Sequence, residues 1–281
     1  MELTNEDFEM ISRTVYDLCG ILLDGNKKYL VEARLRPLMD DFACGTWNEL
    51  YIKLRHGGSK KLREAVIDAI TTHETLFFRD KTPFQALRYK ALPELIDAKE
   101  GTKYPRRIRI WSMACSTGQE PYSIAMVLHE VLGDLTAWDI RILATDISSQ
   151  SVNQASLGIY EELDLQRGMS EEYLRKYFTR VDSGWRVNDS IRALVHFEKR
   201  NILEPFTGLG LFDIVFCRNV AIYFPKEVQK DLFLRIKEVL WEESYLFTGS
   251  TEILTSFGPE FQPQHHCGTV FYRPLKTPAE V

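Results

Sequence analysis

Apolar side chains recur at helical spacing through residues 1–70 of the chain. From Phe8 to Leu22 they return every three or four residues, and Asn5 stands where it can cap the helix that this pattern predicts. No strand pattern alternates with these segments, so the chain begins with an all-helical module. After the first helix, further helices are expected over 27–41, 47–54 and 62–70.

From Arg107 onward the pattern changes, because short apolar strands alternate with helices. Such alternation is typical of a parallel sheet with helices on its faces. Two strands near the C-terminus fit an antiparallel pair that closes the sheet. The expected strands cover 108–111, 140–144, 212–217, 244–248 and 269–272, and the expected helices cover 121–132, 149–157 and 226–240.

Residues 165–200 interrupt this alternation. Ser170 can cap a short helix, and Asp182-Ser183-Gly184 lies as a hairpin turn between two strand-forming runs. Residues 194–199 alternate like a further strand, so we interpret the segment as a small antiparallel β-subdomain inserted in the α/β domain. The predicted divisions are a helical domain over 1–70, a linker with the first helices of the larger domain over 71–106, and the α/β domain over 107–281.

Composition and charge exclude several classes of protein. The chain has 281 residues, of which 44% are hydrophobic and 27% charged, as in globular proteins. A net charge of −5 does not support a chain-wide surface for nucleic acid. No apolar stretch reaches the roughly 18 residues of a membrane span, and the acidic N-terminus does not resemble a signal peptide. We therefore expect a cytoplasmic protein that neither binds nucleic acid nor inserts into a membrane.

The cysteine and histidine pattern predicts no metal site. The five cysteines are an odd number and include no Cys-x-x-Cys clip, so reduced thiols are expected. His265-His266-Cys267 is similar to a metal-binding tract. Adjacent residues of a strand point to opposite faces, however, and cannot easily meet one ion.

The loop after the first predicted strand allows a ligand to approach the backbone closely. In open α/β sheets, ligands bind beyond the carboxyl ends of the strands, and residues 114–118 at the first such end are small. Pro121 suits the first position of the following helix, which leaves backbone amides pointing into the site. With one glycine, the loop matches neither a dinucleotide fingerprint nor a phosphate-cradling loop.

Two carboxylates near these strand ends have two interpretations each. Glu120 either complements the dipole at the helix N-terminus or recognises a cationic ligand. Asp146, after the second strand, either caps the next helix or grips a ribose diol with two hydrogen bonds. The position of Asp146 after the second strand favours the ribose.

Polar residues at two further strand ends fit an adenine ring. Arg218 and Asn219 follow the strand 212–217, where buried unpaired polar groups are costly, and Asn201 follows 194–199. An Asn amide can pair with an adenine edge, or it can close a turn. A small loop, a ribose acid and a strand-end Asn together favour an adenosyl ligand without a diphosphate. They point to S-adenosylmethionine rather than NAD.

Four longer motifs resemble one family. TTHETLFFRD (71–80), WSMACSTGQEPYSIAM (111–126), ATDIS (144–148) and FDIVFCRNVAIYF (212–224) resemble, in this order, the CheR-type chemotaxis receptor methyltransferases. The resemblance covers nearly the whole chain. It implies an N-terminal helical domain and a Rossmann-like methyltransferase domain with an inserted antiparallel β-subdomain. It also implies methyl transfer from S-adenosylmethionine to glutamates of bacterial chemoreceptors, which gives glutamyl methyl esters and S-adenosylhomocysteine for chemotactic adaptation.

The resemblance assigns site residues by their motif positions. Arg79 and Tyr223 are implied to be catalytic and nearest the transferred methyl group. His73 stands where the family usually has Asn, and Gln119 replaces a frequent Glu while Glu120 remains. The implied cofactor contacts are His73, Thr75, Arg79, Glu120, Asp146, Asn201, Ile202, Arg218 and Asn219.

Transfer to a glutamate needs no general base, since the carboxylate is already ionised near pH 7. Positioning should carry most of the catalysis. The Arg79 guanidinium can orient the incoming carboxylate or the cofactor's own carboxylate. Tyr223 either donates to the substrate oxygen or covers the pocket.

A basic segment in the second predicted helix fits an acidic partner such as the helical part of a chemoreceptor. Residues 27–36 have a net charge of +3, and Lys28 and Arg36 share a helix face, although a solvated charged face is an equally ordinary interpretation. Arg34 falls inside the apolar stripe. We expect it at the domain junction, either ion-paired or pointing at the substrate cleft.

Some members of the resembled family tether to a short peptide at the receptor C-terminus through a loop of the β-subdomain. Residues 181–184 are short for that loop, so we expect an enzyme that does not tether. We also expect the protein to be a monomer. Two other functions stay open. One is a receptor-docking scaffold without turnover, which would not need Arg79 or Tyr223, and the other is a methyltransferase for another acceptor. The missing glycines make an NAD-dependent oxidoreductase a weak alternative.

Overall fold

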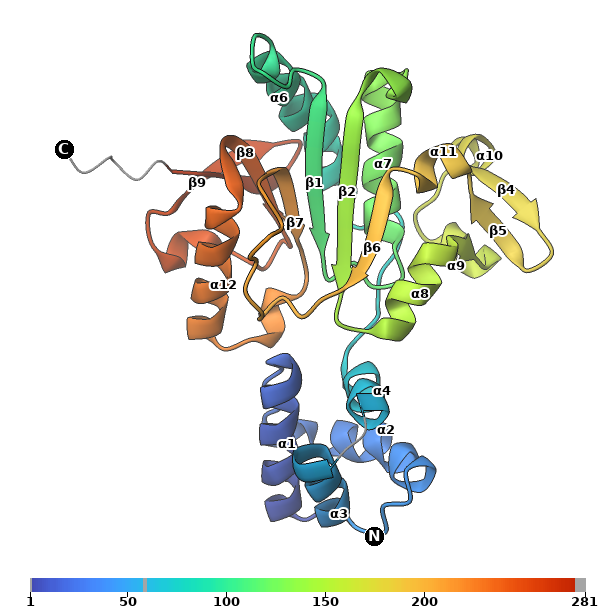
Figure 1. The fold of residues 1–281 in the computed structure, drawn as a ribbon, viewed down its shortest axis with the longest axis vertical. Helices are drawn as coiled ribbons and strands as arrows, with labels where there is room; N and C mark the ends of the chain where they lie inside the picture. Colours follow the sequence, from blue (N-terminus) through green and yellow to red (C-terminus); the bar gives the residue numbers. More distant parts are fainter. Residues whose placement is uncertain (1, 58–59, 276–281) are drawn as a thin grey trace.

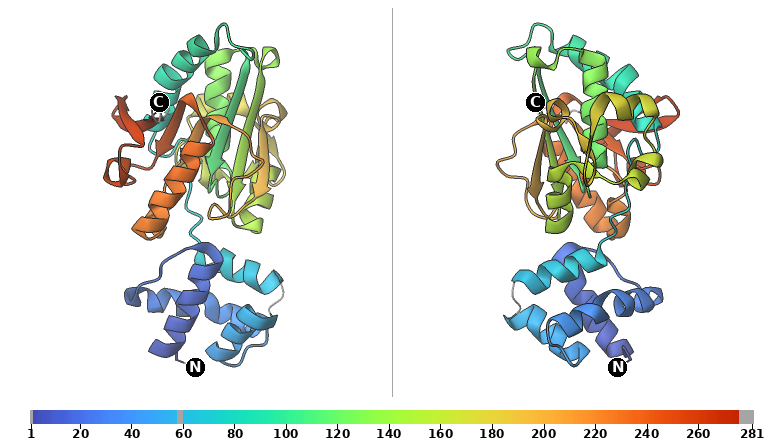
Figure 2. Two further views of the ribbon diagram at one scale, coloured as in Figure 1. Left: turned by 60° about the vertical axis from the view of Figure 1, so that its left-hand side comes forward. Right: turned by 90° about the vertical axis from the view of Figure 1, so that its right-hand side faces the viewer.

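The computed structural model describes residues 2–57 and 60–275, which form a helical domain and a larger α/β domain (Figure 1). The two views of Figure 2 show that an extended linker after the last helix of the small domain joins the two bodies. In the small domain the helices are α1 (Asn5–Cys19), η1 (Gly25–Lys27), α2 (Lys28–Asp41), α3 (Trp47–Ile52), η2 (Lys53–Gly57) and α4 (Lys60–Ile70).

The helical domain packs around the apolar positions that the periodicity predicts. Ile11, Val15 and Leu35 are fully buried in its core. The expected cap at Asn5 is wrong, because the side chain of Thr4 accepts the hydrogen bond that begins α1. The helix also ends earlier than expected. Gly20 adopts a φ of 74°, which stops the helix and leaves Leu22 outside it.

The α/β domain is built on a seven-stranded sheet in the order β6-β2-β1-β7-β8-β10-β9. The first five strands are parallel, and β10 pairs antiparallel with both β8 and β9. The expected antiparallel pairing of the strands 244–248 and 269–272 is thus confirmed. The strand β9 was not expected from the sequence. The strands are β6 (Val195–Lys199), β2 (Asp139–Asp146), β1 (Arg107–Met113), β7 (Phe212–Cys217), β8 (Leu240–Thr248), β10 (Thr269–Pro274) and β9 (Phe261–His266).

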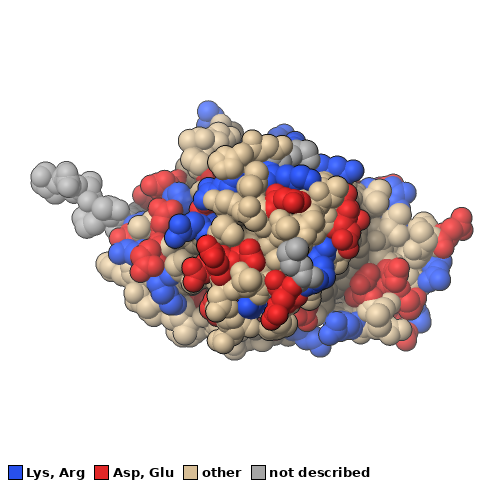
Figure 3. Space-filling model, turned by 90° about the horizontal axis from the view of Figure 1, so that it is seen from below, with Lys and Arg blue, Asp and Glu red and all other residues tan. Residues whose placement is uncertain are grey.

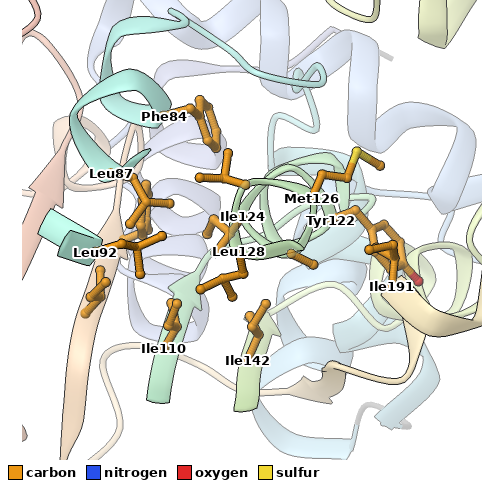
Figure 4. Close-up of a cluster of buried hydrophobic side chains, with 14 of the residues drawn as sticks. Phe84, Leu87, Leu92, Ile110, Tyr122, Ile124, Met126, Leu128, Ile142 and Ile191 are labelled. Atoms are coloured by element: carbon orange, nitrogen blue, oxygen red, sulfur yellow. The ribbon is translucent and has the colours of Figure 1, made fainter. Parts of the chain in front are cut away.

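Helices cover both faces of this sheet, and its central strands are accordingly buried almost without interruption, as all six residues of β7 are. One apolar core joins α5, α6 and α7 to side chains such as Ile110 and Ile142, and Figure 4 shows α7 at its centre. The other core joins α12 to the opposite face through Trp111 and Val215. The helices of the domain are α5 (Thr82–Ala86), η3 (Leu87–Ala91), α6 (Leu92–Lys99), α7 (Gln119–Leu132), η4 (Leu135–Ala137), α8 (Ser149–Leu157), α9 (Glu162–Gln166), α10 (Glu171–Tyr177), α11 (Asp189–Arg192), η5 (Ala221–Tyr223), α12 (Lys226–Glu238) and η6 (Leu254–Phe257).

A second, three-stranded antiparallel sheet lies beside the main one, in the order β3-β5-β4. β4 (Phe178–Val181) and β5 (Gly184–Val187) form the predicted hairpin, and Ser170 caps α10 as expected. The strand expected over 194–199 forms, but it is β6 of the main sheet and pairs parallel with β2. In its place, the two-residue β3 (Ile159–Tyr160) completes the small sheet.

The predicted Rossmann-like α/β fold, with an N-terminal helical domain and a small antiparallel sheet, is confirmed. In the described ranges no helix combines the length and apolar character needed to cross a bilayer. Residues 2–57 and 60–275 also contain no group of three or more His, Cys, Asp or Glu side chains placed to hold a metal ion.

Candidate functional site

A cavity of about 930 Å³, its open mouth included, lies at the carboxyl ends of β1, β2 and β7. In Figure 1 these strand ends point toward the helical domain, and Cys19 of α1 lines the cavity from that side. The chain order of the sheet reverses between β1 and β7, which is where such sheets bind ligands. Every site residue named from the sequence lines this cavity, namely His73, Thr75, Arg79, Glu120, Asp146, Asn201, Ile202, Arg218, Asn219 and Tyr223.

The turn after β1 brings backbone to the cavity wall. Ala114, Ser116 and Gly118 have positive φ values of 52°, 50° and 94°. A Cβ atom on Gly118 would lie 2.8 Å from the Cβ of Ala155, so the turn requires glycine there. α7 begins at Gln119. The expectation that Pro121 opens this helix is therefore wrong by two positions.

Glu120 belongs to a charge network at the cavity wall. Its Oε2 lies 3.0 Å from Nη1 of Arg218, whose Nη2 lies 2.7 Å from Oδ2 of Asp80. The Ser112 hydroxyl donates to the other oxygen of Glu120 at 2.8 Å. Burial raises the pKa of the Glu120 carboxyl, although Arg218 and Ser112 act to lower it. Glu120 thus does more than complement a helix dipole, because it also fixes the guanidinium of Arg218.

Asp146 ends β2 with a buried carboxylate. It accepts hydrogen bonds from the backbone N–H of Ser116 at 2.8 Å and of Ser148 at 2.9 Å. Ser148, not Asp146, caps α8. Burial raises the pKa of Asp146 against the lowering effect of these two amides. Each carboxylate oxygen keeps a second lone pair, so the group can still accept from a ribose diol.

The turn after β7 carries Asn219 and Tyr223 to the cavity. Asn219 has a φ of 58°, in the left-handed region that non-glycine residues rarely adopt. The backbone N–H of Leu22 donates to the carbonyl oxygen of Tyr223 at 3.1 Å. The helical domain is therefore joined directly to the turn that presents Tyr223.

Asn201 and Ile202 line the cavity after β6. Nδ2 of Asn201 donates to the carbonyl oxygen of Leu18 at 3.2 Å, and its Oδ1 accepts from the N–H of Leu203 at 3.0 Å. The amide therefore closes a turn and binds the helical domain, which was the alternative to adenine pairing. Ile202 supplies a buried apolar wall.

The linker between the domains supplies His73 and Arg79. Nε2 of His73 lies 3.1 Å from the carbonyl oxygen of Asp68, and its Nδ1 lies 2.9 Å from Oγ of Ser151 in α8. His73 thus connects the helical domain to α8 of the larger domain as well as lining the cavity. Nη1 of Arg79 donates to the carbonyl oxygen of Glu74 at 2.9 Å, and no ion pair among the described residues includes Arg79.

Two kinds of residue at this site were not predicted from the sequence. Cys19, Ile21 and Arg200 line the cavity, and burial raises the pKa of the Cys19 thiol to about 11. Nothing in the sequence pattern predicts that the end of α1 lies against the cavity at the strand ends. Glu252 accepts from backbone amides of the turn after β7. An acid shortly after the predicted strand 244–248 was a signal that could have been followed.

Arg34 lies at the domain junction as expected, but it forms no ion pair with any residue that the structure describes. Its Nη1 donates to the carbonyl oxygens of Ala69, Ile70 and Thr71, at 3.3, 2.9 and 3.2 Å. It therefore caps the C-terminus of α4 instead of pointing into the cavity. On the surface, Figure 3 shows basic and acidic side chains interspersed when the molecule is seen from the helical domain. This face therefore carries no single large basic field.

The cavity lining suits an adenosyl ligand with a zwitterionic tail. A strand-end carboxylate can accept from a diol, and Arg79 presents a guanidinium that can pair with a carboxylate. The residues present therefore fit S-adenosylmethionine.

Comparison with known families agrees with this fit. Residues 73–266 match the family described as CheR methyltransferase, SAM binding domain, and residues 6–71 match CheR methyltransferase, all-alpha domain.

Similar proteins span almost the same length as this chain. Chemotaxis protein methyltransferase 1 of Pseudomonas aeruginosa is 43% identical over 280 residues, which cover 97% of this chain and 99% of the relative. Chemotaxis protein methyltransferase Cher2 of Pseudomonas putida is 43% identical over 267 residues, with 93% and 95% covered. Chemotaxis protein methyltransferase 1 of Vibrio cholerae is 38% identical over 263 residues, with 92% and 94% covered.

Proposed function

The chain belongs to the CheR methyltransferase family and is an S-adenosylmethionine-dependent methyltransferase, and from this premise we propose that it methylates glutamate side chains of chemoreceptors. The relatives named as chemotaxis protein methyltransferases support the receptor as acceptor. The observation that carries the proposal is the position of Arg79 and Tyr223, which face the same cavity as Asp146 and Glu120. A scaffold without turnover would not need them there.

We assign the cofactor-holding roles to the cavity wall. Asp146 accepts from the ribose hydroxyls, since both of its oxygens are held in place by backbone amides. Glu120 supplies negative charge beside Arg218, so an ammonium and a carboxylate can both be paired in this part of the cavity. The bound cofactor supplies an electrophilic methyl group on a sulfonium. Asn219, Ile202 and Thr75 complete the wall, and His73 supports it from the linker.

Arg79 and Tyr223 orient the acceptor in this proposal. The Arg79 guanidinium keeps donors beyond its bond to the Glu74 carbonyl, and these can hold an incoming glutamate carboxylate in a fixed direction. The Tyr223 hydroxyl donates to the same carboxylate. No proton has to be removed, because the glutamate is ionised at neutral pH. Positioning is therefore the main contribution of the protein to the rate.

A methyl-transfer assay tests the proposal. The purified protein is mixed with methyl-labelled S-adenosylmethionine and membranes that contain chemoreceptors. We expect label on the receptor band that is released by base, as a carboxyl methyl ester requires. Label that resists base would refute the glutamate assignment, and binding of the cofactor without label on any receptor would favour another acceptor or a docking scaffold.

We further propose that the protein does not tether to the receptor C-terminus. The β4–β5 hairpin turns through two residues, Asp182 and Ser183, because Val181 pairs with Gly184. So short a turn offers little surface for a peptide. Titration of a receptor C-terminal peptide should show no saturation, and binding in the micromolar range would overturn this part of the proposal.

A further inference from the structure

Glu252 is a buried carboxylate that holds four backbone amides. It follows β8 and is 5% exposed. Its Oε2 accepts from the N–H of Gly249 at 2.7 Å and of Asn219 at 2.8 Å. Its Oε1 accepts from the N–H of Ala221 at 2.8 Å and of Val220 at 3.0 Å. Each oxygen thus accepts from two backbone N–H groups, so the buried carboxylate is hydrogen-bonded at both oxygens.

Three of these four amides belong to the turn after β7. That turn places Asn219 and Tyr223 against the cavity, and Asn219 holds its positive φ there. A strained backbone of this kind persists when the surrounding structure fixes it. One carboxylate that receives three successive N–H groups provides such fixation.

The space around Glu252 is closely filled. A Cβ atom on Gly249 would lie 2.7 Å from Oε2 of Glu252 and 2.9 Å from Nδ2 of Asn219. A side chain at position 249 would therefore press against both the carboxylate and the turn that it holds. Glu252 itself is not among the described residues that line the cavity.

We propose that Glu252 is a positioning residue of the methyltransferase. Its carboxylate fixes the conformation of residues 219–221 and through them the placement of Asn219 and Tyr223, while it touches neither cofactor nor acceptor. This inference rests on the proposed function and adds to it a residue that acts from behind the cavity wall.

The first test replaces Glu252 by Gln, which has the same size and no charge. The amide oxygen can still accept, but the amide nitrogen faces N–H donors and cannot. We expect the dissociation constant for S-adenosylhomocysteine to rise by about ten- to a hundredfold. Amide hydrogen exchange over residues 218–224 should become faster in the same variant. Calorimetric titration needs no methyl acceptor, so its outcome is independent of whether receptors are the substrate.

Asp213 provides a matched control, because it lies on β7, the strand that precedes the turn. It is also a buried carboxylate, it accepts from the N–H of Arg109 at 2.7 Å, and it ion-pairs with Lys99 at 2.7 Å. It lies near the start of β7, whereas the turn follows the end of β7. Asp213→Asn should lower the melting temperature and leave the affinity for S-adenosylhomocysteine unchanged. An equal loss of affinity in both variants would show a general stability effect and overturn the proposal.

A second variant covers the case in which Glu252→Gln does not fold. Gly249→Ala keeps the charge and pushes a methyl group against Glu252 and Asn219. We expect weaker binding of S-adenosylhomocysteine and faster exchange over 218–224 in this variant too. Wild-type affinity in a folded Glu252→Gln protein, or in Gly249→Ala if the first variant is unfolded, would contradict the positioning role.

Discussion

The two edges of the seven-stranded sheet both carry charged groups that are buried or half-buried, but these groups differ in what surrounds them. At the amino edge, Lys99 pairs with Asp213 at 2.7 Å, and Arg273 of β10 pairs with Glu94 of α6 at 3.0 Å. Each charge there is matched by another across packed elements. At the carboxyl edge, Glu120, Asp146 and Arg218 line an open cavity.

The backbone conformation also distinguishes the carboxyl edge from the amino edge. Six non-glycine residues with positive φ lie in the segments around the cavity, and they are Phe78, Asp80, Lys81, Ala114, Ser116 and Asn219. Strain of this kind collects where a site must be held in shape. Buried charge alone therefore does not mark a functional site. Charge that borders open space on a strained backbone does, and four experiments test this distinction.

The largest effect is expected for Arg79→Ala. If Arg79 orients the acceptor, the turnover rate for methyl transfer should fall by about a hundredfold or more, while the protein stays folded. Arg141→Ala is the matched control, because Arg141 is 77% exposed and lies near the start of β2. A rate close to that of the unmodified protein for Arg79→Ala would remove Arg79 from the mechanism.

The next largest effect is a loss of cofactor affinity that depends on which end of β2 is changed. Asp146 ends β2 and Asp139 begins it. We expect Asp146→Asn to weaken binding of S-adenosylhomocysteine by about ten- to a hundredfold, because the amide loses an acceptor that two backbone N–H groups require. Asp139→Asn should bind like the unmodified protein. Calorimetry on both variants checks this, and equal affinities would contradict the assignment of the ribose to Asp146.

Lowering the pH should affect the charged groups of the two edges differently. Burial raises the pKa of Asp146 and of Glu120, so cofactor affinity should fall as the pH drops through values above the ordinary carboxyl range of about 4. For Glu94 burial opposes ionisation, but hydrogen bonds from Lys90 and Tyr245 outweigh it and lower the pKa. The stability that Glu94 contributes is therefore present above its unfolded-state pKa and is lost as the pH falls through its lower folded-state pKa.

This difference predicts the order of two transitions. Titrations with S-adenosylhomocysteine should weaken at a higher pH than the one at which the melting temperature drops. Affinity that stays constant until the protein unfolds would show that neither raised carboxyl group binds the cofactor in its charged form.

The smallest effect is expected at the amino edge. Glu94→Gln removes the ion pairs with Lys90 and Arg273, but its side chain is 40% exposed, so the free energy of unfolding should fall by about 1 kcal/mol or less. Differential scanning calorimetry measures this change. The affinity for the cofactor should stay unchanged. A clear loss of affinity would contradict the view that the charged groups at the amino edge contribute only to stability.

Local pattern was enough to predict most of the fold. The strands of the parallel sheet, α8 and the β4–β5 hairpin follow from apolar periodicity and turn residues that act within a few positions. Alternation over 194–199 predicted a strand but not its partner, since a period of two is the same in both kinds of sheet. The two-residue β3 is too short to leave such a pattern.

The site was predictable where side chains themselves carry the chemistry. Asp146, Arg218 and Asn219 stand out as polar residues at the ends of apolar strands. Interactions with backbone groups leave no comparable trace in the sequence. The position of Arg34 at the domain junction could be predicted, but its carbonyl partners at the end of α4 could not. The partners of Glu252 are amides of a distant turn and could not be predicted either, although its position shortly after the strand 244–248 made it a candidate.

We propose that the cavity at the carboxyl edge directs a methyl group to a glutamate carboxylate of a chemoreceptor. Mass spectrometry of receptor peptides, after incubation with the protein and S-adenosylmethionine, tests this most directly. We expect peptides heavier by one methyl group, with the addition on a glutamate side chain and absent after incubation with Arg79→Ala. A methyl group on a lysine or cysteine side chain, or glutamate methylation that persists with Arg79→Ala, would contradict it.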